Sequence, residues 1–434
     1  MRESFQNIFK IPELRNRLLF TFALLTVFRI GTHVPTPGVD GSLLATFFEQ
    51  QQANILSFFD MFTGGALSRF SVFALGIMPY ISASIILELL TVVIPHLEQL
   101  KKEGDAGRKR ITQYTRYGTV VLAMVQSLGI SVGLEQFSVG GASVVPNPGW
   151  GFRLLTMTTL TAGTAFIMWL GEQITERGIG NGISLIIFAG IVAQMPSAIG
   201  STATLASEGI LSPMLVVALV AIMLAVVGII VFFESGQRRV PIQYAKRVVG
   251  RRMYGGTSTH LPLKVNTSGV IPPIFASSVL LFPASILQFS QSQWLQSISG
   301  FLTPATWLYT LLTAGLIFFF CYFYTAIIFN PVEVADNFKK YGGFVPGIRP
   351  GRPTAEYIDR LLTRLTFVGA IYLSAIVLLP DYMRAYMNVP FFFGGTGLLI
   401  VVGVAMDTMA QIESHLVMRH YEGLMRKGRI KSRR

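Results

Sequence analysis

The sequence predicts an all-α polytopic membrane protein with ten transmembrane helices in two inverted five-helix halves and both termini in the cytoplasm. Three observations lead to this fold class. Charged residues are scarce and segregated, basic residues alternate between successive connecting segments, and two apolar segments five helices apart match one another. The first observation indicates that the chain enters a membrane, the second how often it crosses, and the third how the crossings are related.

The composition excludes a soluble enzyme and a disordered protein. Charged residues make up 13% of the 434 residues, about half of the roughly 25% that is usual in soluble proteins. Residues 265–332 contain no Asp, Glu, Lys or Arg, and residues 178–207 and 209–233 are equally free of charge. Runs of this kind predict transmembrane helices of about 20 residues. The single cysteine, Cys321, excludes a disulfide framework and a cysteine-based metal site.

Apolar stretches bounded by charged residues, Pro or Gly give ten helix candidates. They are residues 17–33, 73–94, 113–134, 153–172, 182–204, 210–233, 268–290, 305–329, 365–384 and 390–411. The segments outside them hold the 35 Lys and Arg residues unevenly: 31 lie in the N-terminal tail and every second segment after it, and 4 in the others. Because cytoplasmic connections carry an excess of positive charge, this alternation predicts ten crossings with both termini in the cytoplasm.

The outer segment between the first two spans, Thr32–Ser71, is too polar to cross a membrane and is rich in Phe. Its end, residues 58–69, contains the pair Gly64 and Gly65 and predicts a short helix that breaks at the glycines and folds back into the protein. Irregular backbone at membrane depth requires burial in protein or a cavity to line. An interfacial amphipathic loop is the alternative interpretation.

Spans two and seven begin with similar sequences. Residues 76–87 and 269–280 coincide at six of twelve positions, including Gly76 with Gly269 and Pro79 with Pro272. Since the predicted topology runs these spans in opposite directions, the match predicts an inverted repeat. Its halves are residues 1–205, with spans one to five, and residues 206–434, with spans six to ten. Chance similarity between two apolar segments is the alternative.

Inverted repeats place their working site near the bilayer midplane, where an ion-coupled transporter needs ionisable residues. Here Arg29, Glu88, Glu172 and Asp407 fall near span ends. The pattern argues against a proton- or sodium-coupled mechanism, although an inverted-repeat secondary transporter for a small solute remains the rival function. An aliphatic constriction that resists water and ions by dewetting fits the pattern better.

The cytoplasmic charge is concentrated in the loops 234–264 and 331–364 and the basic tail 412–434. The first loop carries three basic pairs, with Tyr244 between the first two and Tyr254 just after the last, a composition that can contact phosphates and stack on bases. In the second loop, Arg349 stands between Ile348 and Pro350 in a Gly/Pro-rich tip. These loops predict a docking surface for ribosomal RNA or an acidic protein. For the tail, anionic lipid is an equal alternative.

The sequence contains no pattern that predicts an enzyme. It has no phosphate-binding loop of the Gly-x-x-x-x-Gly-Lys-Ser/Thr type, and its His residues are scattered. We find no nucleophile, acid/base pair or metal constellation, which argues against a membrane-embedded hydrolase. Residues 178–182, Gly-Ile-Gly-Asn-Gly, follow an apolar helix instead of a strand and predict a turn between spans four and five. We therefore expect no catalytic residue, cofactor or metal.

Over essentially its whole length the sequence resembles the bacterial SecY family, the channel subunits of the general protein-secretion translocon. The stretches that carry the resemblance are Met61–Arg69, Gly76–Ile86, Ile174–Ser184, Arg238–Lys264 and Phe344–Gly351. The resemblance implies a multi-pass protein of the bacterial plasma membrane. It implies two halves forming a clamshell, a pore closed by an aliphatic ring and a plug, and a lateral gate that opens to lipid.

Carried over residue by residue, the resemblance assigns four sets of site residues. The pore ring falls on Ile81, Ile85, Ile183, Ile187, Ile274 and Ile400. The plug corresponds to about residues 55–70, including Phe62, Gly64, Gly65, Leu67 and Arg69. The lateral gate includes Pro79, Ser82, Pro272, Phe275 and Ser277. Cytoplasmic docking falls on Arg238, Arg239, Lys246, Arg247, Arg251, Arg252 and Arg349.

The resemblance also implies a function and partners. The chain would pass unfolded polypeptides outward and release transmembrane segments sideways into lipid. The implied partners are SecE and SecG subunits, the SecA ATPase motor, the ribosome through 23S rRNA and exit-site proteins, signal sequences with their nascent or precursor polypeptides, and anionic lipids.

Overall fold

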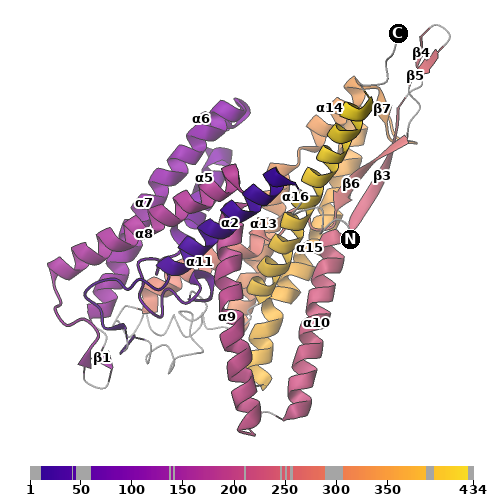
Figure 1. Cartoon of the computed structure of the whole chain (residues 1–434). Helices are drawn as coiled ribbons and strands as arrows, with labels where there is room; N and C mark the ends of the chain where they lie inside the picture. Colours follow the sequence, from indigo (N-terminus) through magenta and orange to yellow (C-terminus); the bar gives the residue numbers. More distant parts are fainter. Residues whose placement is uncertain are drawn as a thin grey trace. The chain divides into compact units, whose positions relative to one another are not determined.

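The computed structural model describes residues 11–41, 43–44, 60–135, 138–139, 142–209, 212–244, 247–249, 252–254, 258–288, 306–387 and 395–428. Within these ranges each predicted span coincides with a helix (Figure 1). These helices are α2 (Pro12–Gly31), α5 (Met78–Val93), α7 (Asp105–Glu135), α8 (Trp150–Arg177), α9 (Gly182–Ser207), α10 (Pro213–Ser235), α11 (Ile271–Gln288), α13 (Trp307–Ile328), α15 (Arg352–Met387) and α16 (Gly395–Gly428).

Most of these helices are suited to a bilayer. Among the described residues, seven helices are long and apolar enough to cross a membrane. The pair formed by α5 and the short helix α6 (Pro95–Lys102), bent by 99°, is a further candidate. The chain is a predominantly helical, multi-pass membrane protein. The number of crossings and the side on which the termini lie stay predictions.

Several helices extend beyond the predicted spans. Helix α15 begins at Arg352, whereas its span was predicted from residue 365, and α16 continues to Gly428 instead of residue 411. Hydropathy detects only the apolar part of a helix, while backbone hydrogen bonding continues into polar sequence. In α15 the added turns bury Ile358 and Leu362 in a small hydrophobic core, which explains why they stay helical.

The described chain divides into two compact units. The first comprises Met1–Leu205, Ser278–Thr303 and Ile400–Arg434. Within it α7 packs on α5 and α8, and α2 packs on α8 (Figure 1). A Cβ atom at Gly163 of α8 would collide with the carbonyl oxygen of Val72, so glycine allows the chain before α5 to pass close to this helix.

Ion pairs tie α7 to α8 at two levels. The Nε of Arg116 donates to Glu172 Oε1 at 2.7 Å. Near the other end of the pair, Arg153 donates through Nε and Nη2 to the carboxylate of Glu135, with the shortest distance 2.6 Å. The Glu135 carboxylate also accepts the N–H of Gly149. Such two-pronged, charge-assisted bonds fix the relative position of two helices.

The turn between α8 and α9 is joined to helices from both ends of the chain. The Ile179 N–H donates to Thr21 Oγ1 of α2 at 3.1 Å, and the Gly180 N–H donates to Gln411 Oε1 of α16 at 2.9 Å. Ile179 also forms a small hydrophobic cluster with Leu14 of α2. The turn lies where the sequence predicts it, and side chains of α2 and α16 satisfy two of its main-chain donors.

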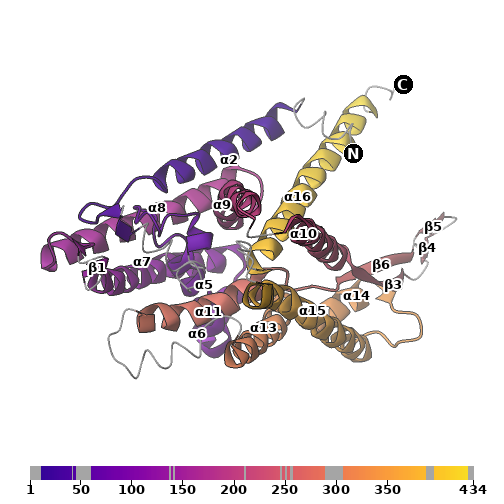
Figure 2. The same cartoon turned by 90° about the horizontal axis from the view of Figure 1, so that it is seen from below.

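The second unit comprises Ala206–Ser277 and Pro304–Leu399. In it α13 packs on α15, and the short helix α14 (Pro331–Lys340) packs on α15 as well (Figure 2). The Asn330 side chain caps α14 by accepting the N–H groups of Val332 and Glu333. Phe233 of α10 stacks on Tyr372 of α15 with ring centroids 4.4 Å apart.

The all-helical prediction is incomplete in the loop 234–264, where the chain forms antiparallel strands. Strand β3 (Gln237–Tyr244) pairs with β6 (Ser258–Lys264), from Gln237 opposite Lys264 to Gln243 opposite Ser258. The short strands β4 (Arg247–Val249) and β5 (Arg252–Tyr254) pair with each other in the same segment. In β3, Val240 and Ile242 are buried while their neighbours are exposed, a period-2 pattern. Hydropathy averaged over a window as long as a helix does not show this alternation, so the strands were not predicted from it.

Two further short strand pairings complete the described sheets. Strand β7 (Gly343–Phe344) pairs with β3, which gives a three-stranded sheet in the order β6-β3-β7. Strands β1 (Ser138–Val139) and β2 (Ala142–Ser143) form a hairpin between α7 and α8. The β3–β7 pairing joins the two loops that the sequence predicts to be docking surfaces.

The matching sequences at the start of spans two and seven adopt the same local structure. Gly76 and Gly269 both have positive φ, +55° and +65°. In each case the helix begins two residues later, at Met78 in α5 and Ile271 in α11, with proline as its second residue. Glycine is favoured in the left-handed region, and proline is favoured in the first turn of a helix. The predicted internal match is therefore also a match of backbone conformation.

Candidate functional site

The isoleucines predicted to form the pore ring lie on four helices. Ile81 and Ile85 are one turn apart on α5 and both are buried. On α9, Ile187 is buried, while Ile183 is partly buried and approaches Gly171 of α8. Two further members of the set are buried on α16 and α11, namely Ile400 and Ile274. The ring itself stays a prediction.

The predicted plug is described from Asp60 onward, and residues 55–59 lie outside the described residues. Asp60–Thr63 form one helical turn, which ends at Gly64 and Gly65 with φ of +71° and +84°. The backbone then turns until Phe70. Its apolar side chains are at most 6% exposed; they are Met61, Phe62, Ala66, Leu67 and Phe70. The described part of the segment is buried in the protein, which agrees with the predicted fold-back.

The Asp60 carboxylate organises the plug segment from within. Its Oδ1 accepts the N–H groups of Leu67 at 3.0 Å and Ser68 at 2.9 Å. The Thr63 hydroxyl also donates to it at 3.4 Å. Burial raises the pKa of the Asp60 carboxyl above its ordinary value, and the hydrogen bonds from Ser68, Leu67 and Thr63 oppose that rise. One buried side chain therefore closes the loop that contains the two glycines.

Glycines allow the plug segment to lie directly against α9. A Cβ atom at Gly64 would lie 2.9 Å from the Cα of Gly190, and one at Gly190 would lie 3.0 Å from the carbonyl oxygen of Phe62. Gly190 is eight residues from the start of α9, which corresponds to about 12 Å along the helix. It is also one turn from Ile187. The plug segment and part of the predicted pore ring therefore meet on the same stretch of α9.

Three polar residues that sequence analysis did not assign to the plug contact it: Arg29, His33 and Gln194. Arg29 Nη1 of α2 donates to the Gly64 carbonyl oxygen at 2.7 Å, and Gln194 Nε2 of α9 donates to the Asp60 carbonyl oxygen at 2.9 Å. Arg69 Nη1 lies 2.6 Å from His33 Nε2. In the sequence, Arg29 and Gln194 could have been noticed because they are polar residues in otherwise apolar spans. Their hydrogen-bond partners could not have been predicted, because tertiary structure sets them.

The residues predicted for the lateral gate lie in the first turns of α5 and α11. Pro79 is buried and Ser82 is partly buried on α5. On α11, Phe275 makes edge-to-face contacts with Phe320 and Tyr324 of α13, and the Ser277 hydroxyl donates to the main chain of its own helix. Pro272 is buried in the first turn of α11. Their role in a gate stays a prediction.

The two predicted docking loops form one platform. Strand β7 of the second loop pairs with β3 of the first, and Val240, Leu263, Val345, Ile358 and Leu362 form a common core beneath them. We call this the docking platform: residues 237–244, 258–264 and 343–362. The rigid core explains how loops far apart in sequence can present one surface.

Three of the predicted docking residues lie on this platform, namely Arg238, Arg239 and Arg349. Arg238 and Arg239 are exposed on β3, where consecutive residues point to opposite faces of the strand. Arg247 and Arg252 belong to the strands β4 and β5, and Lys246 and Arg251 lie outside the described residues. Arg349 is exposed, and its carbonyl oxygen accepts the Thr354 hydroxyl at 2.8 Å, which fixes the loop.

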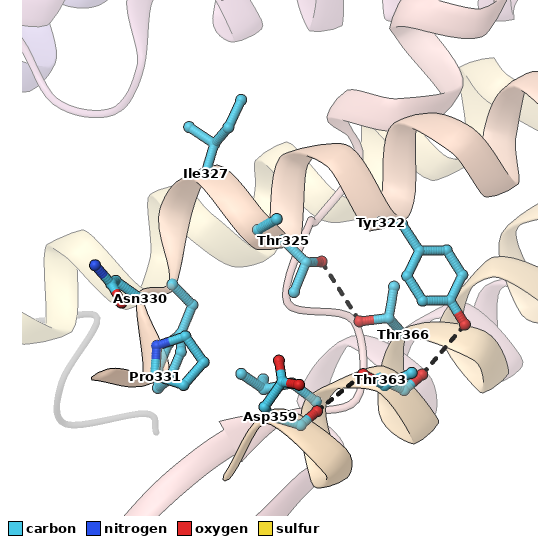
Figure 3. A pocket seen from close by; sticks show the side chains of 11 residues that line it. Tyr322, Thr325, Ile327, Asn330, Pro331, Asp359, Thr363 and Thr366 are labelled. Atoms are coloured by element: carbon cyan, nitrogen blue, oxygen red, sulfur yellow. Dashed lines mark hydrogen bonds between the residues drawn. The ribbon is translucent and has the colours of Figure 1, made fainter. Parts of the chain in front are cut away.

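A pocket of about 420 Å³ lies between the end of α13 and the first turns of α15 (Figure 3). Its lining is mixed in character, with Tyr322, Asn330 and Asp359 among the polar side chains. The Tyr322 hydroxyl donates to the Thr363 carbonyl oxygen across it. None of the site residues predicted from the sequence lines this pocket.

Comparison with known proteins places this arrangement in a family. The family model described as SecY matches residues 71–409. The chain is 56% identical over 425 residues to protein translocase subunit SecY of Escherichia coli K12, covering 97% of this chain and 96% of the relative. It is 54% identical over 426 residues to the same subunit of Pseudomonas aeruginosa, covering 97% and 95%.

Solved structures share the fold at low sequence identity. A structure reported as a protein-conducting channel aligns with a TM-score of 0.65 and 16% identity, covering 92% of each chain. Sec61 in a canine ribosome–channel complex from the endoplasmic reticulum aligns with a TM-score of 0.60 and 15% identity, again over 92% of each chain. With a family model over most of its length and relatives more than half identical over nearly all of it, the chain belongs to the SecY family.

Proposed function

We propose that this chain is the channel subunit of a secretion translocon in the bacterial plasma membrane. It passes unfolded polypeptides outward and releases transmembrane segments sideways into lipid. The observation that carries this proposal is the 56% identity to protein translocase subunit SecY of E. coli over 97% of the chain. The apolar character of the helices and the buried plug segment agree with it.

In this proposal the isoleucine ring and the plug segment close the pore in series. Aliphatic side chains at a constriction exclude water and ions by dewetting, and they make no directional demand on the polypeptide that passes. Ile187 and the seat of the plug segment lie within one turn on α9, which supports a role for both in the same pathway. Replacing Ile274 or Ile400 with Asn should loosen the seal and raise ion leak.

We assign opening to a separation of two halves, residues 1–205 and 206–434. The lateral gate lies between spans two and three on one side and spans seven and eight on the other. A signal sequence enters between α5 and α11, the helices whose starts share a left-handed glycine and a first-turn proline. The plug segment leaves its seat, and the isoleucine side chains then close around the moving chain.

The energy for transport comes from partners, because the proposed role is that of a conduit and not of an enzyme. The docking platform, with its exposed Arg238, Arg239 and Arg349, receives a SecA-type ATPase motor or a translating ribosome. Structures of ribosome–channel complexes that share this fold support such a role. SecE and SecG subunits brace the helices, and the basic tail contacts the ribosome, the motor or anionic lipid.

The test uses a photo-crosslinking side chain at Ile85 or Ile274 in membranes that contain the full chain. A stalled secretory polypeptide is presented with either an intact or a broken signal sequence. We expect crosslinks from both positions that depend on the intact signal. If neither position contacts the polypeptide while the protein is folded and inserted, the pore assignment is wrong. Uptake of a small solute by vesicles containing only this chain would then favour the secondary transporter.

A further inference from the structure

We propose that Arg29 and Gln194 are positioning residues that latch the plug segment in the closed channel by donating hydrogen bonds to its main chain. The inference rests on the proposed channel function and adds a mechanism for holding the closed state. The residues come from α2 and α9, outside the plug itself. Neither belongs to the pore ring, plug, gate or docking sets predicted from the sequence.

The two hydrogen bonds hold opposite ends of one helical turn. Gln194 Nε2 donates to the carbonyl oxygen of Asp60, the first described residue of the plug segment. Arg29 Nη1 donates to the carbonyl oxygen of Gly64, where the turn ends. At the end of a helix the carbonyl oxygens lack intrahelical partners, so Gly64 offers a free acceptor. A guanidinium is the stronger of the two donors because it is charged.

Apart from the contact of Arg69 with His33, the other described contacts of the plug segment are apolar or made by the backbone. Met61, Phe62 and Leu67 are buried, and the Gly64 and Gly190 backbones touch without side chains between them. Apolar contacts stabilise the position of the plug segment on α9, but because they are non-directional they do not fix its orientation. The two donors therefore supply the direction: they fix which way the turn faces on α9.

The far end of the plug segment is attached in a different way. The Thr36 N–H donates to the Phe70 carbonyl oxygen at 2.9 Å, the Val72 N–H donates to the Val34 carbonyl oxygen at 2.9 Å, and Pro35 forms a β-bridge with Ser71. Phe70 has a φ of +44°, a value that non-glycine residues rarely adopt. Main-chain pairing thus anchors this end, while side chains hold residues 60–64. The segment is built to release at Asp60–Gly64 and to pivot near Phe70.

The main test replaces the donors and measures the idle channel. In membrane vesicles containing the full chain, Arg29→Gln should raise ion leak without a substrate by roughly tenfold, as expected for loss of a hydrogen bond from a charged group. Gln194→Leu, which keeps the side-chain size, should raise it by roughly threefold because the lost bond is neutral. Export of a substrate with a broken signal sequence should rise in the same order.

Controls separate a latch from a general loss of stability. Arg29→Lys keeps a charged donor and should restore most of the seal. Arg153→Gln removes a charge-assisted pair between α7 and α8 that does not contact the described plug segment, so it should lower thermal stability without raising leak. Gln194→Leu places an apolar residue in an apolar span, so it supplies a folded variant even if Arg29→Gln accumulates poorly.

The outcomes distinguish this inference from the function on which it rests. Wild-type leak in both Arg29→Gln and Gln194→Leu, or an equal rise in Arg153→Gln, would overturn the latch while signal-dependent crosslinking at Ile85 still supports the channel. Absence of that crosslinking in the wild-type protein would instead overturn the channel assignment, whatever the leak.

Discussion

The starts of α5 and α11 have the same backbone but different surroundings. Both pair a left-handed glycine with a helix that begins two residues later and carries proline in its first turn. A Cβ atom at Gly76 would lie 2.9 Å from Thr63 Cγ2 of the plug segment, whereas one at Gly269 would meet no atom of the described residues within 4 Å. A repeated backbone motif can thus keep its conformation while, among the described residues, one copy has a steric partner that the other lacks.

The largest expected effect comes from substituting the two glycines. Gly269→Ala should lower the free energy of unfolding by about 1–2 kcal/mol, because a residue with a Cβ is disfavoured in a left-handed conformation. Gly76→Ala should add about 1–3 kcal/mol of overpacking against Thr63. Thermal unfolding of the purified channel in detergent measures the difference between the two variants.

A matched rescue identifies the cause of that difference. Thr63→Ser removes the methyl group that the new Cβ would meet and keeps the hydroxyl that donates to Asp60. The double variant Gly76→Ala with Thr63→Ser should therefore be about as stable as Gly269→Ala. Equal destabilisation by the two single glycine variants would show that Thr63 moves aside freely and that the starts of α5 and α11 do not differ.

The start of α11 is held by hydrogen bonds of the buried Asn266 side chain, whereas the start of α5 has a steric contact. Asn266 Nδ2 donates to Glu234 Oε1 at 2.6 Å and to the Gly269 carbonyl oxygen at 3.0 Å, and its Oδ1 accepts the Ser268 hydroxyl. Asn266→Ala should cost about 1–3 kcal/mol because buried polar groups lose their partners. Thermal unfolding checks this, with the neighbouring Thr267→Ala as control. A loss below that of the control would contradict the assignment.

The plug segment beside α5 should respond to pH, whereas the amide of Asn266 has no titratable proton. Burial raises the pKa of Asp60 above the ordinary 3.8. A group with a raised folded-state pKa stabilises the fold below its unfolded pKa, and that contribution is lost as pH rises through the folded value. We therefore expect the stability of the wild type relative to Asp60→Asn to fall as pH rises from below 3.8. Unfolding midpoints over a pH series measure this, and a rising difference would contradict it.

The smallest effect is expected at Ser277, in the first turns of α11. Its hydroxyl donates to the carbonyl oxygens of Pro273 and Ile274 in its own helix, at 2.7 and 3.1 Å. Ser277→Ala should change stability by less than about 0.5 kcal/mol, as for most substitutions without a distinctive partner. A larger loss in thermal unfolding would indicate that the hydroxyl has a partner beyond α11 and would sharpen the contrast with α5.

Much of the helical framework could be predicted from the sequence because membrane helices have a strong signal. A run such as residues 265–332, which has no charged side chain, is typical of transmembrane helices. The turn at residues 178–182 and the fold-back at Gly64 and Gly65 were also predictable, because glycine marks both places. The isoleucine ring and the gate came from family resemblance, whereas the docking loops were also predicted from their basic residues, and all of these roles remain proposals.

The strands and the plug contacts could not be predicted from local pattern. The pairing of β3 with β7 joins residues about a hundred positions apart, and nothing in either segment identifies its partner. Likewise, Gln194 is an isolated amide in an apolar span until Asp60 is placed beside it. Sequence reveals that a polar group is unusual, whereas the acceptor that it contacts depends on tertiary structure.

The turn between α8 and α9 constrains the order in which the protein can mature during synthesis. Gly180 donates to Gln411, a residue 231 positions later in the chain. At ribosomal speeds of about 5–20 residues per second, that acceptor appears roughly 10 to 50 s after the donor. For this period the helices from α2 to α9 exist without the hydrogen bond that α16 supplies to their turn. This contact can therefore form only late in synthesis, after most of the chain has been made.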